Sequence, residues 1–324
     1  MEKQMHGPVG VEQPMATEAM SSPDIGLPEK ARREENFRRE MAGVCEKYPQ
    51  LSEKIKRSLE TPQLGEYHNE GQRMDSHLSL MLVSLERLIQ GNVHEMLVGE
   101  TELVKIMQGV ATAHDEKEPE RITIAPACVE YVFFHDIAKP DCLSLKFEDE
   151  KKGFDISWQQ WKTIESGGEP YRWKGKPIKS ISFYHASEGP YGQHGNKGAQ
   201  ALKGKGISRD ILTAIHNHEV VFQQFDRISA ANYEKHFVEP GFTEDLRNFI
   251  FTGSYIDLVS SIRPDGKPNL DRFVNLVRSR NNFLLIQEYM KKGSVFPGNS
   301  LVNLKKRNDI LTRDDIEEAL TPQT

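Results

Sequence analysis

The sequence has few cysteines, no long apolar run and no excess of basic residues. Its three cysteines are an odd number without CxxC spacing, which argues against a disulfide framework and a thiolate zinc site and fits a reducing setting: Cys45, Cys128 and Cys142. No segment approaches the roughly 20 apolar residues that a bilayer span needs, so we expect a soluble, cytoplasmic protein with no membrane partner. The net charge of -6 argues against nonspecific nucleic-acid binding as the main role, although it leaves room for a local basic patch.

The usual motifs of several enzyme classes are also missing. No GxxxxGK[ST] or GxGxxG follows an expected strand, and there is no G-x-S-x-G elbow. Residues 1–30 are rich in Met, Pro, Gly and Glu without an apolar period, which predicts a flexible tail. The tail has no apolar run behind a basic start, so we do not interpret it as a signal peptide. We expect a single helical domain over residues 31–324.

The apolar period of the remaining chain is mostly 3.6, which predicts an all-α fold with a minor β element. Helices are expected at 31–60, 76–90, 100–113, 126–139, 194–202, 208–225, 243–261, 270–289 and 312–320. The first of these ranges would contain one or two helices. In residues 145–184, aromatic and apolar residues are separated by Gly, Lys and Glu. This pattern predicts a small β-hairpin or irregular insertion with a short helix near Ser157–Glu165.

The segment YVFFHDIAKP carries the strongest chemical signal. It brings His135 and Asp136 side by side at the end of an apolar helix, followed by Lys139. Burying a carboxylate and an imidazole there costs several kcal/mol unless something pairs them, and a divalent metal would do so. The alternative is an ordinary His-Asp pair at a helix end. The pair His114-Asp115 illustrates that alternative, because it lies in a polar run and receives no role.

Further histidines and an aspartate occupy inward-facing positions on the neighbouring helices. They are His77, His194, His216, His218 and Asp257. Taken singly, each is more often a satisfied core polar group than a ligand. Together, on successive helices around His135 and Asp136, they predict a metal site in the core. The sequence does not decide between His216 and His218, although His218 shares a face with Ile211, Ile215 and Phe222.

The order of these residues resembles the HD-domain superfamily of metal-dependent phosphohydrolases. HDIAKP is similar to the central motif of that family, QHGNKGAQAL to a helix that opens with a ligand histidine, and NHE to the stretch that follows. The segment EYHNEGQRMDSHLSLML is similar to the start of the HD domain in bacterial tRNA nucleotidyltransferases, which makes His68 a candidate pocket residue. The resemblance covers about residues 67–280 and implies an HD-domain-like helical bundle. Two departures are the long gap between His77 and His135 and the insertion, which could be a lid, a specificity wall or plain structure.

The resemblance implies a metal-dependent phosphohydrolase or phosphodiesterase that acts on a nucleotide, a cyclic nucleotide or a phosphorylated RNA end. One or two divalent ions (Mn, Mg, Fe, Co or Zn) are expected as cofactor. The first would be held by His77, His135, Asp136 and Asp257. His194 with His218 or His216 would hold the second or orient the phosphate. Catalytic roles are expected for Asp136 and Lys139, and substrate contacts for Lys139, Arg263, His68 and His185. Arg263 could instead be a helix-end arginine, and His185 an ordinary loop histidine. The rival hypotheses are a di-iron HD-type oxygenase and a non-catalytic bundle that binds a nucleotide or RNA.

Overall fold

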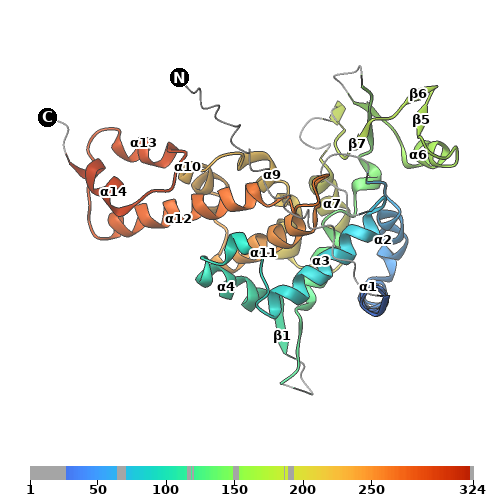
Figure 1. Ribbon diagram of the computed structural model, residues 1–324, viewed down its shortest axis with the longest axis horizontal. Helices are drawn as coiled ribbons and strands as arrows, with labels where there is room; N and C mark the ends of the chain where they lie inside the picture. The colour runs from blue at the N-terminus through green and yellow to red at the C-terminus, as the bar shows by residue number, and fades with distance from the viewer. Residues whose placement is uncertain are drawn as a thin grey trace, which may run out of the picture.

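The computed structural model is mainly helical, with short antiparallel strands at two places on its surface (Figure 1). It describes residues 27–63, 71–114, 118, 120–148, 153–185, 187–188 and 193–321. Across these ranges, no helix combines the length and the apolar character that a membrane crossing requires. The α-helices are α1 Leu27–Lys47, α2 Ser52–Leu59, α3 Met74–Ile89, α4 Thr101–Ala111, α5 Pro126–Phe134, α6 Trp158–Glu165, α7 His194–Leu202, α8 Arg209–Asn217, α9 Val220–Gln224, α10 Ala230–Tyr233, α11 Glu244–Ser260, α12 Asp271–Lys291, α13 Ser300–Lys306 and α14 Arg313–Leu320.

The remaining regular elements are short. Single turns of 3-10 or π-helix are η1 Pro49–Leu51, η2 Glu95–Leu97, η3 Lys139–Asp141 and η5 Glu234–Val238. The strands are β1 Thr112–His114, β2 Ile122–Ile124, β3 Ser144–Lys146, β4 Phe154–Asp155, β5 Arg172–Trp173, β6 Lys176–Pro177 and β7 Ser180–Ser182. They form the antiparallel pair β1-β2, the antiparallel sheet β4-β3-β7 and the antiparallel pair β5-β6.

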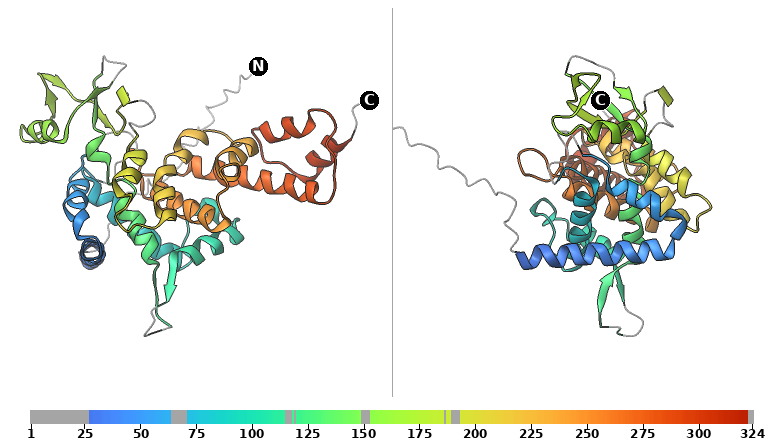
Figure 2. Two further views of the ribbon diagram at one scale, coloured as in Figure 1. Left: turned by 180° about the vertical axis from the view of Figure 1, so that it is seen from behind. Right: turned by 90° about the vertical axis from the view of Figure 1, so that its right-hand side faces the viewer.

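The helical body is built around α11 and α5, whose side chains are mostly buried. Helix α11 packs against α3, α4 and α8, while α5 packs against α1, α3 and α8. Every residue of α5 from Cys128 to Phe134 is buried, which explains why this segment has no polar face. Figures 1 and 2 show the body with the β1-β2 hairpin and the β3–β7 insertion projecting from opposite sides. The expected all-α fold with a minor β element is therefore confirmed.

Most expected helices occur, and the differences have local causes. Helix α7 has the expected bounds, whereas α5 ends at Phe134 instead of continuing to Lys139. Pro140 has no N–H with which to continue the α-helical bonds. The chain after Phe134 is held instead by bonds to the third residue back, from Ile137 to Phe134 and from Lys139 to Asp136, as it enters η3. The expected helix 208–225 is divided into α8 and α9, because the His218 and Asn217 side chains bond to the carbonyls of Ile215 and Thr213.

The N-terminal prediction is corrected at its boundary. Helix α1 begins at Leu27, so residues 27–30 of the expected tail are helical. Residues 1–26 lie outside the described part of the chain. The pair β1-β2, helix α10 and helix α13 were not expected, and all three are too short to show an apolar period.

The insertion has a small apolar core of its own. It consists of Leu143, Leu145, Phe147, Ile156, Trp161, Ile164 and Ile181, with five partly buried aromatic and aliphatic residues around it. The expected short helix is present as α6, and Ser157 caps it in a capping box with Gln160. Because its apolar residues pack mainly on one another, the insertion is a separate lobe attached to the helical body.

One contact between α11 and α5 leaves no space for an additional methyl group. A Cβ at Gly253 would lie 2.7 Å from Cζ of Tyr131, whose buried ring stacks on His135. We predict that Gly253→Ala lowers the free energy of unfolding by about 1–3 kcal/mol, because the ring cannot move without disturbing the core. Urea denaturation measures the change.

Gly109→Ala in α4 is the matched control. A Cβ there meets nothing within 4 Å, so the substitution should stabilise the helix by about 0.5–1 kcal/mol. Equal stabilisation by both substitutions would contradict the tight α11–α5 contact.

Candidate metal centre

Six buried side chains from five parts of the helical body meet in the core. They are His77 of α3, His135 and Asp136 after α5, His194 of α7, His218 after α8 and Asp257 of α11. Their ligand atoms form two groups: His77, His135 and Asp257, and Asp136, His194 and His218. Within each group these atoms lie within 4.8 Å of one another. The buried His and Asp groups could hold a metal ion.

Local sequence explains how the second group assembles. Gly195 follows His194 directly, and a Cβ at Gly195 would lie 2.9 Å from the carbonyl oxygen of Ile215 and 3.0 Å from Cε1 of His218. The missing side chain therefore lets α7 approach the end of α8 closely enough for the two imidazoles to meet. The ring centroids of His194 and His218 are 4.8 Å apart.

Asp136 lies between the two groups and faces both. Its Oδ2 is 2.9 Å from Nε2 of His135 and 2.7 Å from Nζ of Lys139. Its Oδ1 is 2.9 Å from Nε2 of His194 and 3.7 Å from Nε2 of His218. On the far side of His135, Nε2 of His77 lies 3.1 Å from Oδ1 of Asp257. The Asp136 carboxylate therefore lies within contact distance of residues from both groups.

The histidines are oriented by bonds that point away from the cluster. Nδ1 of His135 lies 3.0 Å from the carbonyl oxygen of Val132, Nδ1 of His218 lies 2.6 Å from that of Ile215, and Nδ1 of His194 lies 3.2 Å from that of Phe183. A carbonyl only accepts, so each Nδ1 carries the proton and each Nε2 turns a lone pair inward. Outer-shell bonds of this kind are usual for histidines that bind metals.

These proton positions leave buried atoms without donors. Nε2 of His194 and Nε2 of His218 are 2.9 Å apart, and neither can donate to the other when both protons are on Nδ1. Nε2 of His135 and Oδ1 of Asp136 have no hydrogen-bond partner. A cation bound by either group would satisfy the atoms of that group. Imidazole and carboxylate ligands together suit Mn, Fe, Co or Zn, so the residues present fit a divalent metal.

The charges of the cluster are strongly coupled. Burial raises the pKa of Asp136, but the neighbouring His135 and Lys139 outweigh burial and hold that pKa well below its ordinary value. Burial also raises the pKa of Asp257, which the His77 hydrogen bond and His135 nevertheless bring below its usual range. Both carboxylates are therefore ionised and available as ligands at neutral pH.

The pKa values of the two histidines in the second group move in opposite directions. Burial, followed by the nearby His194, lowers the pKa of His218 to about 4, so that His218 is neutral at neutral pH. Burial opposes protonation of His194 too, but the Glu219 and Asp136 carboxylates outweigh it and raise the pKa of His194. A neutral imidazole is the form that binds a metal.

Some of the candidate residues lie elsewhere. His216 is exposed and takes no part in the cluster, because its position two residues before His218 turns it to the opposite side of the helix. Nη1 of Arg263 lies 2.8 Å from Oδ2 of Asp271 in the first turn of α12. No hydrogen bond or ion pair joins Arg263 to the six clustered residues, which favours its interpretation as a structural arginine after a helix.

Of the other candidate substrate contacts, Lys139 lies beside the cluster and His185 lies in the segment that follows β7. Lys139 is buried beside Asp136, and its Nζ lies 4.7 Å from the centroid of the Phe183 ring. Nε2 of His185 lies 3.0 Å from the carbonyl oxygen of Leu143, and its Nδ1 lies 3.2 Å from Oε1 of Glu188. A substrate role for His185 stays a prediction. His68 lies outside the described residues.

Two residues around the cluster were not anticipated from the sequence. Oε1 of Glu219 lies 3.1 Å from Nδ1 of His194, so this carboxylate supports the imidazole from behind. Phe183 covers Lys139 and lies edge-on to His194, with ring centroids 6.2 Å apart. Glu219 follows His218 directly in the chain, and that adjacency was the one signal that could have found it.

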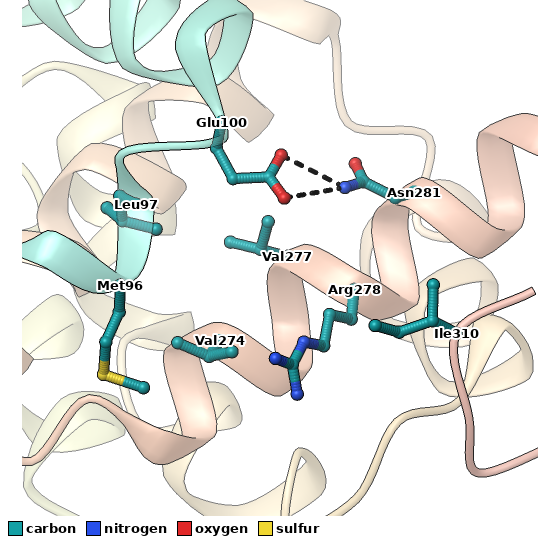
Figure 3. A pocket seen from close by; sticks show the side chains of 8 residues that line it. All are labelled: Met96, Leu97, Glu100, Val274, Val277, Arg278, Asn281 and Ile310. Atoms are coloured by element: carbon teal, nitrogen blue, oxygen red, sulfur yellow. Dashed lines mark hydrogen bonds between the residues drawn. The ribbon is translucent and has the colours of Figure 1, made fainter.

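A cavity of about 200 Å³ lies away from the cluster, between η2, the start of α4, and α12 (Figure 3). Among its lining residues, the Glu100 carboxylate accepts hydrogen bonds from Nδ2 of Asn281 at 3.1 and 3.2 Å. None of the six clustered residues lines it. We interpret it as a packing gap that Glu100 and Asn281 bridge.

A scan against protein-family models, a search of curated proteins and a search of solved structures each give no match. The interpretation of the cluster therefore rests on its own geometry. The resemblance to the HD-domain superfamily stays a prediction, carried by the order and spacing of the residues.

Glu219 provides a test of the outer-shell interpretation. Glu219→Gln keeps the shape of the side chain but removes the charge behind His194, so metal affinity should fall by about 10- to 100-fold. Competition titration with a chromogenic chelator measures the affinity. The matched control is Glu188→Gln, which changes an exposed carboxylate that faces His185 and Lys197. Equal affinities for all three proteins would contradict the role of Glu219.

The lowered pKa of His218 links the stability of the metal-free protein to pH. Because the folded-state pKa of about 4 lies below the ordinary value of 6.5, the unfolded chain takes up this proton first as the pH falls. The stabilising contribution is complete above pH 6.5 and declines until the pH reaches 4. The test measures the free energy of unfolding of the chelator-treated proteins by urea denaturation. Between pH 7.5 and about pH 5, this free energy should fall by about 2 kcal/mol more in the wild type than in His218→Gln. An identical pH dependence in the two proteins would exclude this linkage.

Proposed function

We propose that the protein is a metal-dependent phosphohydrolase or phosphodiesterase with a helical core like that of the HD domain. The observation that carries the proposal is the position of Asp136, which faces His135 and Lys139 through one oxygen and His194 and His218 through the other. A carboxylate with two ligand groups and a buried ammonium around it supports chemistry on an anionic substrate.

Two divalent ions would be held by the two groups of ligands. His77, His135 and Asp257 would hold one, His194 and His218 the other, and Asp136 would lie between them. When bound, such ions act as Lewis acids and lower the pKa of a coordinated water toward neutrality. Four imidazoles among six ligands favour Mn, Fe, Co or Zn over Mg, which prefers oxygen ligands.

Lys139 would bind the substrate phosphate. Its Nζ lies 2.7 Å from Oδ2 of Asp136, so an ammonium stands beside the bridging carboxylate. An ammonium there would donate to a nonbridging phosphate oxygen and offset the charge that develops on it. Phe183 packs over Lys139 and limits the access of water to it, which strengthens both interactions.

The rival functions differ in what they require of the cluster. A di-iron oxygenase would use the same histidines and aspartates, and two irons per chain with oxygen uptake would identify it. A bundle that only binds a nucleotide or RNA has no need of two complete ligand groups. The complete ligand set therefore favours catalysis over binding alone, and the buried Lys139 beside Asp136 supports an anionic substrate.

The test compares two histidines that are two residues apart. Asp136→Asn and His218→Ala should each lower hydrolysis of bis(p-nitrophenyl) phosphate by about a thousandfold, since several kcal/mol of transition-state stabilisation by the metals would be lost. His216→Ala is the matched control and should keep the wild-type rate, because His216 is exposed. Metal content by elemental analysis should fall with activity in the first two variants.

Two results would overturn the proposal. The first is wild-type turnover by the metal-stripped Asp136→Asn protein. The second is two irons per chain with oxygen uptake and no phosphate ester cleaved, which would identify the oxygenase.

A further inference from the structure

The β5-β6 hairpin concentrates positive charge in a protein whose net charge is -6. Its segment YRWKGKPIK, residues 171–179, contains four basic residues and no acidic one. All four are exposed: Arg172, Lys174, Lys176 and Lys179. The hairpin turns at Lys174 and Gly175, both with positive φ, so Lys174 is presented at the tip.

An exposed and a partly buried aromatic ring lie beside these charges. Phe154 of β4 is 43% exposed, and its ring centroid is 6.2 Å from that of Trp173 on β5. Nζ of Lys174 lies 5.6 Å from the centroid of each ring. We call Phe154, Trp173 and Lys174 the aromatic-basic face. On it an ammonium and two rings are available to the same ligand.

Further basic residues lie in the same lobe. Lys179, just before β7, donates its backbone N–H to the carbonyl of Lys146 in β3. In the described part of the chain, no ion pair joins Lys146, Lys174 or Lys179 to a carboxylate. Within the described ranges these ammonium groups therefore have no close carboxylate, and they can contact an anionic ligand.

The same lobe extends to the candidate metal centre. Strand β7 pairs with β3 at the edge opposite β4, and the chain then continues into Phe183. Phe183 contacts Lys139, and its backbone carbonyl accepts from Nδ1 of His194. In Figures 1 and 2 the lobe rises from the end of the body where α7 begins. One compact lobe thus carries the aromatic-basic face and contributes a wall of the cluster.

We infer that the aromatic-basic face binds single-stranded nucleic acid and holds the strand beside the metal centre. The cations would follow the phosphates while unpaired bases stack on Trp173 and Phe154, which is how proteins bind single strands without reading their sequence. The inference deepens the proposed function, on which the identification of the strand as substrate rests. Stacking requires unpaired bases, so duplexes should bind more weakly than single strands.

The experiment measures fluorescence anisotropy of labelled oligonucleotides of about 20 nucleotides with the full chain. RNA and DNA oligonucleotides are tested separately to show which of the two nucleic acids binds. A duplex of the same sequence tests whether unpaired bases are required. Trp173→Ala should weaken single-strand binding by about 5- to 150-fold, the loss of one stacked base. The double variant Lys174→Glu, Lys179→Glu should reduce the slope of log K against log salt by about 1 to 2, since two phosphate contacts are lost.

The matched control reverses two other exposed lysines, Lys203→Glu with Lys205→Glu, which follow the far end of α7. Their reversal keeps the same change of net charge and should leave the salt slope near the wild-type value. Trp173→Ala could destabilise the insertion. The lysine substitutions are on the surface and should leave the fold intact, so the binding inference stays testable through them. Equal weakening by the control would overturn the inference, and so would hairpin-dependent binding to phosphatidylserine vesicles without binding to strands.

Failure of the docking inference can be told from failure of the proposed function. Metal-dependent hydrolysis of bis(p-nitrophenyl) phosphate without any strand binding would overturn the docking inference alone. Hairpin-dependent strand binding by a protein without metal or hydrolysis would support docking and overturn the proposed function.

Discussion

Asp136 is an ionised carboxylate in the core, and the arrangement of the helical body depends on what surrounds it. Its two oxygens face different partners, with His135 and Lys139 on one side and His194 and His218 on the other. A buried charge is tolerated only when opposite charge and hydrogen bonds compensate its lost hydration. Helices α5, α7 and α8 therefore have to meet at this point, and the glycines and turns nearby permit the close approach.

The cluster is also tied to the apolar core. The histidines direct their outer nitrogens at backbone carbonyls, so each ring is held by the helix turn that carries it. Tyr131 stacks on His135 and fills the space that Gly253 leaves on α11. This combination of outer hydrogen bonds and tight packing keeps the inner nitrogens in place, which is the preorganisation that a metal site requires.

The insertion is stabilised separately from the helical body. Its own small apolar core lets it fold as a lobe attached to the helical body. The lobe reaches the cluster through Phe183 and the segment around His185, while its far edge carries basic and aromatic side chains. Chemistry and recognition would thus be divided between a rigid body and an attached lobe.

The sequence alone indicated most of the helices, the insertion and a set of candidates that contains all six clustered residues, because these follow from local patterns. An apolar period places His77 and Asp257 on buried faces, and Pro140 requires a break near the His135-Asp136 pair. The tertiary structure alone decided that His218 and not His216 joins the cluster, that Arg263 pairs with Asp271, and that Asp136 faces both groups. It also showed Glu219 and Phe183 beside His194. Those facts depend on contacts between segments far apart in the chain, and the spacing of residues along one helix does not encode the direction from which another helix arrives.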